Sequence, residues 1–147
     1  MKGRAIALVW VALALCPALA GCLKEYNTYR SKSLQTYARV LAKQIVTCEE
    51  MYYIEHNEYT DDFEAMDCDW PSAYEGEGAP YTLYLGPDRF LDLSGTHYQL
   101  PPGIDPLVTG DRFMAAIAGN IDDDPLLDVW TVDNINSPEN VMNDLEN

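Results

Sequence analysis

Four oxygen-bearing side chains recur in one short stretch near the end of the chain: Asn120, Asp122, Asp124 and Asp128. Calcium takes about six to eight hard oxygen ligands, and alternate residues of a tight loop direct such oxygens inward. The spacing therefore predicts a calcium site. A solvated acidic turn is the alternative, because Pro125 stands where calcium loops normally carry glycine, and Thr131 stands where an EF-hand carries Glu.

The remaining reactive side chains form no recognisable catalytic set. The sequence contains no G-x-S-x-G, no H-E-x-x-H and no glycine-rich phosphate loop. Glu49 and Glu50 are adjacent on a predicted helix, where neighbouring side chains diverge by about 100° and do not converge on one substrate. His56 lies near the end of that helix, where an imidazolium interacts favourably with the helix dipole. We therefore expect no enzymatic activity.

Composition excludes further classes of protein. The chain has 147 residues, which suits one domain, and 48% apolar residues, which is too many for a disordered chain. Nine Lys and Arg stand against 24 Asp and Glu, for a net charge of -15. Such a chain cannot present the broad basic face that binds nucleic acid.

The first 22 residues read MKGRAIALVWVALALCPALAGC and predict an export signal, either that of a lipoprotein or an ordinary secretory signal with a chance Cys. The apolar run from Ala5 to Ala20 is shorter than the roughly 20 residues of a membrane-spanning helix. Its ending, Leu-Ala-Gly-Cys at residues 19–22, resembles the lipobox of bacterial lipoproteins. This resemblance implies cleavage of a signal peptide, residues 1–21, and lipidation of Cys22. Leu23 in place of Asp favours the outer membrane.

If the chain is exported, the state of each cysteine can be predicted. Cys16 leaves with the signal and Cys22 takes lipid, so Cys48 and Cys68 remain as a pair in an oxidising compartment. We expect them to form a disulfide. Two buried free thiols are the alternative, whereas a zinc site would need more soft ligands at short spacing.

Charge is divided along the mature chain. Residues 22–43 carry five basic residues against one acid, whereas residues 44–147 carry two against 23. A basic segment beside a lipid anchor is attracted to anionic headgroups, and an acidic body is repelled from them. We expect membrane attachment through the lipid, with the acidic head directed away from the bilayer. A merely solvated helix face is the plainer interpretation.

Hydrophobic periodicity predicts one long helix followed by strands. The apolar positions Leu34, Ala38, Leu41, Ile45, Cys48 and Tyr52 recur every three or four residues, so residues 31–57 read as an amphipathic helix with a stop at Asn57. Residues 59–79 read as a loop with one helical turn near 62–66. Alternating patterns predict strands at 81–85, 89–93, 112–118 and 128–132, and a weaker one at 97–100. The expected fold is α+β, a helix packed on an antiparallel sheet of three to five strands.

Two stretches resemble type IV pilins and pseudopilins. Residues 47–61, TCEEMYYIEHNEYTD, are similar to the paired tyrosines and acidic exit at the end of the pilin helix. Residues 113–124, FMAAIAGNIDDD, followed by DVWTVD at 128–133, are similar to the C-terminal hairpin of many pilin-like proteins. Some pseudopilins bind calcium in an Asp-rich C-terminal loop, which is consistent with the calcium prediction.

The N-terminus departs from the family. A prepilin peptidase site has Gly, then an aromatic residue or Met, then Glu at the fifth position, but here Arg4 follows Gly3 and Leu8 takes the fifth position. The resemblance therefore implies the head fold without polymerisation.

We expect a signal peptide at 1–21, a lipid-anchored tether at 22–30, a pilin-like domain at 31–133 and a flexible acidic tail at 134–147. The expected function is interaction with envelope proteins, as a structural or accessory component of a type IV pilus or type II secretion-like system. The alternative is an envelope binding lipoprotein that presents a small ligand or calcium. Either would face the periplasm or the cell surface.

Overall fold

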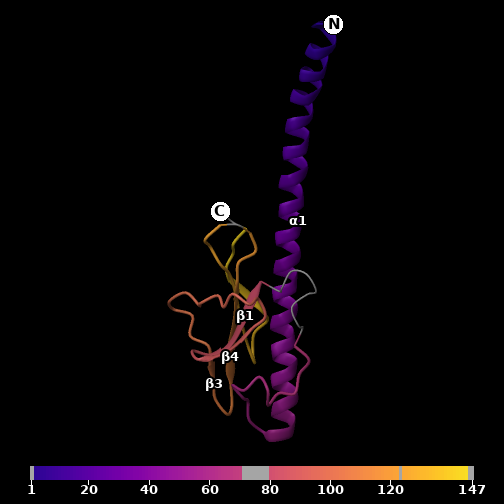
Figure 1. Cartoon of the computed structure of the whole chain (residues 1–147). Coiled ribbons are helices and arrows are strands. Elements are labelled where there is room, and N and C mark those ends of the chain that lie inside the picture. Colours follow the sequence, from indigo (N-terminus) through magenta and orange to yellow (C-terminus); the bar gives the residue numbers. More distant parts are fainter. Residues whose placement is uncertain (1, 71–79, 123, 146–147) are drawn as a thin grey trace.

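One long helix lies against an antiparallel sheet, which confirms the predicted α+β class. The computed structural model describes residues 2–70, 80–122 and 124–145, with side chains described from residue 25 onward. Figure 1 shows the helix continuing well past the sheet toward the N-terminus, while its C-terminal part lies along the sheet. In the described part of the chain, no helix has both the length and the apolar content needed to cross a membrane.

The helix α1 spans Lys2–His56. The predicted apolar stripe is its packing face, since Ala38, Leu41, Ile45 and Cys48 are all buried against the sheet. The helix ends as predicted at Asn57, whose φ of 58° is left-handed and whose N–H donates to the carbonyl of Tyr53 at 2.8 Å. Asn is one of the few residues that tolerate this conformation at a helix end.

Within the described residues the sheet has six strands, one more than the largest number expected. They are β1 (Tyr81–Gly86), β2 (Arg89–Asp92), β3 (Leu107–Val108), β4 (Phe113–Gly119), β5 (Asp128–Asp133) and β6 (Glu139–Met142). Their order is β2-β1-β4-β5-β6, and β3 pairs with β4 beside this path. All pairings are antiparallel.

The sheet is buried on both faces, which explains the continuous apolar runs of β1 and β4. Alternate residues such as Leu83 and Ile117 pack against α1. Their neighbours Tyr84 and Ala116 point to the opposite face, where Tyr98, Leu100 and Ile104 of the loop between β2 and β3 cover them. That loop makes the second apolar layer of the head.

The weak strand predicted at residues 97–100 is wrong. His97 has a φ of 52°, which is incompatible with extended backbone, and the segment forms no ladder. Instead of strand pairing, a side-chain hydrogen bond holds this segment: the Tyr84 hydroxyl donates to the carbonyl of Tyr98 at 2.6 Å.

The predicted flexible tail contains β6, so that prediction is corrected for the described residues 134–145. Glu139 pairs with Thr131 and Met142 with Val129 on β5. Side chains hold the segment as well: Gln35 of α1 donates to Asn143 at 2.6 Å, and Asn140 donates to Asp128 at 2.8 Å. The polar composition of residues 134–147 predicts a frayed tail, but Asn140 and Asn143 form hydrogen bonds with Asp128 and Gln35. Residues 146 and 147 lie outside the described residues.

The predicted disulfide joins Cys48 on α1 to Cys68 in the following loop, with Cα atoms 6.2 Å apart. Between them the chain makes the expected single turn, in which the Met66 N–H donates to the Asp62 carbonyl at 3.3 Å. Residues 71–79 of the predicted loop lie outside the described residues.

Candidate functional site

The Asp-rich turn connects β4 to β5 and is built from side chains that cap their own backbone. Asn120, Asp122 and Asp124 each accept the N–H two residues ahead, at 3.2, 2.8 and 2.7 Å. Asn120 also donates its amide to the Asp124 carbonyl at 2.6 Å. These bonds use one oxygen of each aspartate, which leaves the second carboxylate oxygen of Asp122 and Asp124 available to a ligand.

A third carboxylate comes from the segment that follows the edge strand β6, whose end pairs with the start of β5. Asp144 follows β6, and one of its oxygens lies within 4.8 Å of oxygens of Asp122 and Asp124, with all three atoms mutually within that distance. Ser31 of α1 lies beside the cluster, because its hydroxyl donates to the Ile121 carbonyl at 3.2 Å. The site therefore lies at the end of the head where α1 continues toward the N-terminus (Figure 1).

Asp144 is the unusual member of the group. It is only 3% exposed; its Oδ2 accepts the Ile121 N–H at 3.2 Å, and its Oδ1 is buried without a hydrogen-bond partner. Burial, followed by the negative charges of Asp122, Asp124 and Asp128, raises the pKa of Asp144 to about 6, against the lowering effect of the Ile121 N–H. A buried carboxylate oxygen without a donor is costly unless a cation or proton compensates it.

Asp128 is not part of this group, although the sequence placed it there. Its carboxylate is fully buried under α1 and accepts four hydrogen bonds. Tyr81 and Trp130 donate to Oδ2, each at 2.8 Å, while Gln35 and Asn140 donate to Oδ1 at 2.9 and 2.8 Å. Because both of its oxygens accept hydrogen bonds in the core, Asp128 is not free to bind a cation. Asp144 occupies the place beside Asp122 and Asp124 that was predicted for Asp128.

The sequence carried no signal for Asp144. It lies 22 positions after Asp122 in a segment that reads as an acidic tail, and only the pairing of β6 with β5 brings it to the turn. Asp123, within the predicted loop, lies outside the described residues. The geometry that remains, three converging carboxylates with one unpartnered oxygen, suits a hard divalent cation such as calcium.

The other predicted site residues lie apart from this cluster. Cys22 falls within α1, where side chains are not described, and the Cys48–Cys68 disulfide staples the opposite end of α1 to its loop. His56 lies at that end, stacked on Tyr52 with ring centres 4.0 Å apart and its Nδ1 3.1 Å from the Tyr52 carbonyl.

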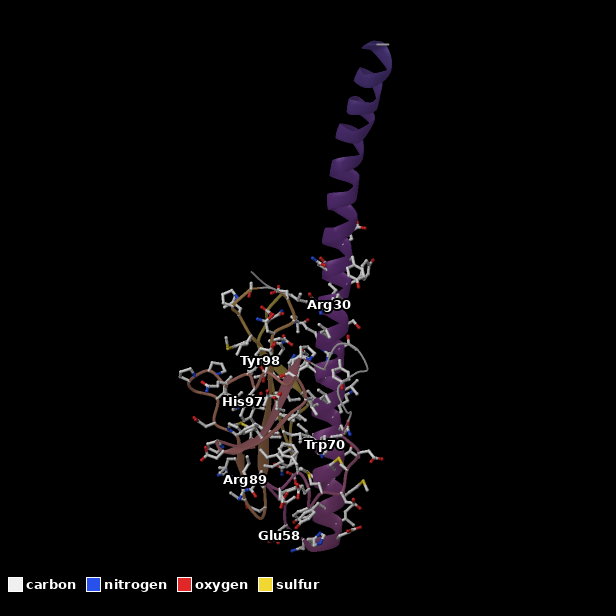
Figure 2. All side chains as sticks on the ribbon, in the orientation of Figure 1. Arg30, Glu58, Trp70, Arg89, His97 and Tyr98 are labelled. Atoms are coloured by element: carbon white, nitrogen blue, oxygen red, sulfur yellow. A yellow bond between two sulfur atoms is a disulfide. The ribbon has the colours of Figure 1, made fainter. Side chains whose placement is uncertain are left out.

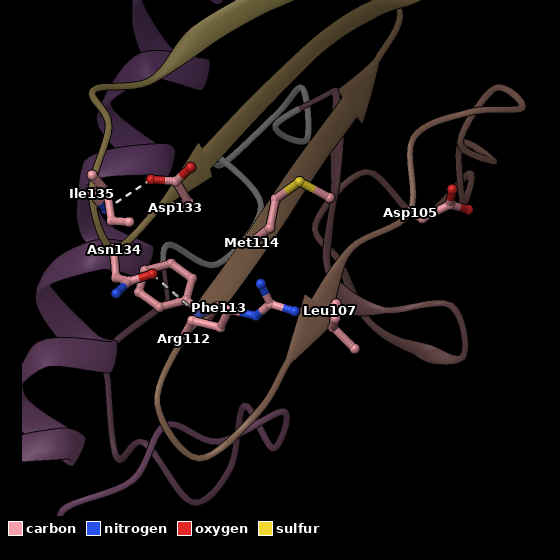
Figure 3. Close-up of a pocket in the computed structure, with 8 residues that line it drawn as sticks. All are labelled: Asp105, Leu107, Arg112, Phe113, Met114, Asp133, Asn134 and Ile135. Atoms are coloured by element: carbon pink, nitrogen blue, oxygen red, sulfur yellow. Dashed lines mark hydrogen bonds between the residues drawn. The ribbon is translucent and has the colours of Figure 1, made fainter.

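A separate hollow of about 300 Å³ lies beside β3, where β4 begins and β5 ends (Figure 3). Phe113 and Met114 line it, and the exposed side chains of Leu107 and Ile135 flank it, the latter 83% exposed. The Asp133 carboxylate accepts the Ile135 N–H at 2.7 Å and so fixes the turn that carries this isoleucine. The accessible surface of the hollow is mainly apolar, and Asp105, Arg112 and Asn134 line it as well.

Comparison with known proteins adds no family. A scan against protein-family models gives no match, and a search of curated proteins gives no significant match either. Function must therefore be argued from the residues themselves.

Proposed function

We propose that this chain is a non-enzymatic, lipid-anchored protein of the bacterial cell envelope whose pilin-like head acts by contacting other proteins. Its setting would be a type IV pilus or a type II secretion-like system, as a structural or accessory component. The tetrapeptide ending at Cys22 supports the anchor. The order of one long helix and then an antiparallel sheet supports the pilin-like head.

The observation that carries the interaction is the apolar hollow at the end of the sheet. Ile135 is 83% and Leu107 is 48% exposed, and both flank a concave apolar surface on a strongly acidic chain. Single exposed apolar residues are ordinary, but a hollow bordered by several is typical of a protein contact. Arg112 in the same lining supplies a cation among acidic neighbours, which would help to orient a partner.

A photo-crosslinking amino acid placed at residue 135 tests this proposal in native envelopes. A crosslinked adduct is expected from position 135, and its yield should fall with Leu107→Asp. The matched control is position 54, because Ile54 is 80% exposed on α1. Equal adducts from both positions, or none from 135, would contradict a contact through the hollow.

The anchor has its own test. Cys22→Ser should abolish incorporation of labelled palmitate and leave an unprocessed precursor, whereas Cys16→Ser should change neither. Palmitate labelling that persists in Cys22→Ser refutes the lipoprotein assignment and leaves the crosslinking result to be judged separately.

A second candidate function, presentation of calcium or a small ligand to an envelope complex, is favoured by Asp144. Its partnerless oxygen beside Asp122 and Asp124 is what a calcium ligand set requires before the ion enters. Millimolar calcium should raise the melting temperature more than sodium chloride of equal ionic strength, because a ligand of the folded state alone stabilises it. Equal calcium stabilisation of a variant with Asp122→Asn and Asp124→Asn would show that the cluster is only an acidic turn.

A further inference from the structure

A second cavity lies on the face of the sheet that is turned away from α1. It measures about 420 Å³, is open to solvent, and is bordered by the β1–β2 turn and by the loop that follows His97. Figure 2 shows His97 and Tyr98 on this side of the head, with the sheet between them and the helix. Cavities of roughly 300 to 1,000 Å³ are the usual size for small-molecule sites.

A stacked pair of aromatic rings belongs to the lining of this cavity. The rings of Phe90 and His97 are stacked with centres 4.0 Å apart and planes 10° apart. Phe90 is 43% exposed, and His97 is also exposed, whereas the third ring of the cluster, Tyr84, is 4% exposed. Stacking covers one face of each ring, so a ligand can reach the outer faces and the edges of this pair.

The position of His97 is maintained against backbone strain. Its φ of 52° is unfavourable for a residue with a side chain, so surrounding contacts must hold it there. The Asp92 carboxylate holds the turn by accepting N–H groups from Ser94, Gly95 and His97 at 2.9, 3.2 and 3.1 Å. Packing of the core does not account for this conformation, because the His97 ring is exposed.

The polar lining selects the charge of the ligand. Asp88, Gln99 and Asp105 are among the lining residues, and the described lining contains no Lys or Arg. With a net charge of -15, the chain repels anions such as phosphate and sulfate. The lining instead offers carboxylate and amide oxygens that accept hydrogen bonds from hydroxyl groups.

We propose that this cavity binds a neutral pyranose unit of a glycan, which goes beyond the proposed function above. The apolar C–H face of the sugar lies on an outer face of the Phe90–His97 pair, which carries partial negative charge. Its hydroxyls donate to Asp88, Gln99 and Asp105. A small organic cation is the competing ligand, because one exposed ring face and the lining carboxylates would attract it as well.

The test uses the full chain in detergent and a panel of methyl pyranosides derived from glucose, galactose, mannose and N-acetylglucosamine. Saturation-transfer NMR should detect at least one of them at millimolar concentration. Phe90→Leu and His97→Gly should each weaken binding by ~10-fold or more, equivalent to about 1.4 kcal/mol. Glycine accepts the backbone angle of residue 97, so the second variant removes the ring and keeps the turn.

Tyr29→Ala is the matched control, since it removes an aromatic ring that is 74% exposed on α1, and it should leave binding unchanged. Tetramethylammonium supplies the competing chemistry. Binding of that cation in place of every pyranoside, no binding at all, or pyranoside binding that survives both ring variants while circular dichroism shows intact folding would each overturn the proposal.

Discussion

The hydroxyl of Tyr81 donates to Oδ2 of Asp128 at 2.8 Å beneath the helix, where both side chains are fully buried. The same hydroxyl lies 3.2 Å from the Leu34 carbonyl of α1. Burial, followed by the charge and hydrogen bond of Asp128, raises the pKa of Tyr81 far above its ordinary value, so the phenol keeps its proton. One buried carboxylate thus joins α1, β1, β5 and β6 through four neutral donors.

Asp128→Asn should therefore be strongly destabilising although it conserves volume. The amide turns an NH2 group toward two of the donors that now face a carboxylate oxygen. We expect a loss of about 3 kcal/mol in the free energy of unfolding, measured by urea denaturation. Tyr81→Phe removes one hydrogen bond and should cost about 1 kcal/mol. A smaller loss for Asp128→Asn than for Tyr81→Phe would contradict the central role of the carboxylate.

Glu49 predicts an unusual dependence of stability on pH. Its side chain is fully buried; Oε2 accepts the Thr60 N–H at 3.2 Å and Oε1 has no partner. Burial, followed by the charges of Asp61 and Glu50, raises the pKa of Glu49 to about 7, against the lowering effect of the Thr60 N–H. The folded state then binds this proton more tightly than the unfolded state does. The resulting contribution of Glu49 to the free energy of unfolding is fully present below its unfolded pKa of 4.5, and it is lost as the pH rises to about 7.

Comparison with Glu49→Gln isolates this effect from the other acids. Both proteins should unfold with similar free energies at pH 4, and the variant should gain on the parent by the order of 1–3 kcal/mol by pH 8, since one pKa unit is worth about 1.4 kcal/mol. Parallel stability curves for the two proteins across pH 4–8 would exclude a raised pKa at this position.

Asp144→Asn should change stability in opposite directions with and without calcium. At pH 7.5 in a chelator, the variant removes a buried charge that faces Asp122 and Asp124, so its melting temperature should rise above that of the parent. In millimolar calcium the order should reverse, because the variant lacks one ligand. If the variant has the higher melting temperature under both conditions, the loss of charge repulsion explains the result, and the calcium site is contradicted.

Gly119 should be irreplaceable for steric reasons. A Cβ built there would lie 2.0 Å from the carbonyl oxygen of Pro80 and 2.4 Å from the Tyr81 ring. Because the backbone cannot yield without displacing β1 from β4, Gly119→Ala should destabilise by several kcal/mol, on the order of 3. Gly95→Ala is the comparison, because no atom lies within 4 Å of its Cβ and only its φ of 72° opposes the substitution. A larger loss at Gly95 would contradict the packing argument.

The covalent staple gives the last stability prediction. Replacing Cys48 and Cys68 together by alanine should lower the free energy of unfolding by about 3 kcal/mol, a typical effect for a loop of this size. Thermal denaturation with and without reductant should show the parent falling to the level of the double variant, which should not respond to reductant. A parent that is insensitive to reductant while denatured would contradict a closed bridge.

The elements that the sequence predicted well are those whose signal is periodic. The helix stripe through Leu41 and Ile45 and its stop at Asn57 follow from local rules. So do the strands beginning near Tyr81 and Asp128. The disulfide followed from counting cysteines in an exported chain.

The errors arose where tertiary contacts override composition. Asn140 and Asn143 look like tail residues, yet they supply donor and acceptor groups to a buried network, and this docks β6. Asp128 has the spacing of a loop ligand, but β5 begins at it and turns its carboxylate into the core. Spacing alone cannot distinguish an aspartate that faces a cation from one that faces a tyrosine and a tryptophan.

The placement of the disulfide has a mechanical consequence. Tension on the N-terminal part of α1 enters the head near Ser31 and Gln35, whose side chains bond to the turn and to the β6 end. The bridge lies at the far end of the same helix and closes a segment of 20 residues. Extended chain spans at most about 3.3–3.6 Å per residue, so the bridge withholds about 70 Å of contour length under load. When the head is pulled through the N-terminal part of α1, the chain with the disulfide should extend less than the chain with reduced cysteines. It should also refold over a shorter distance.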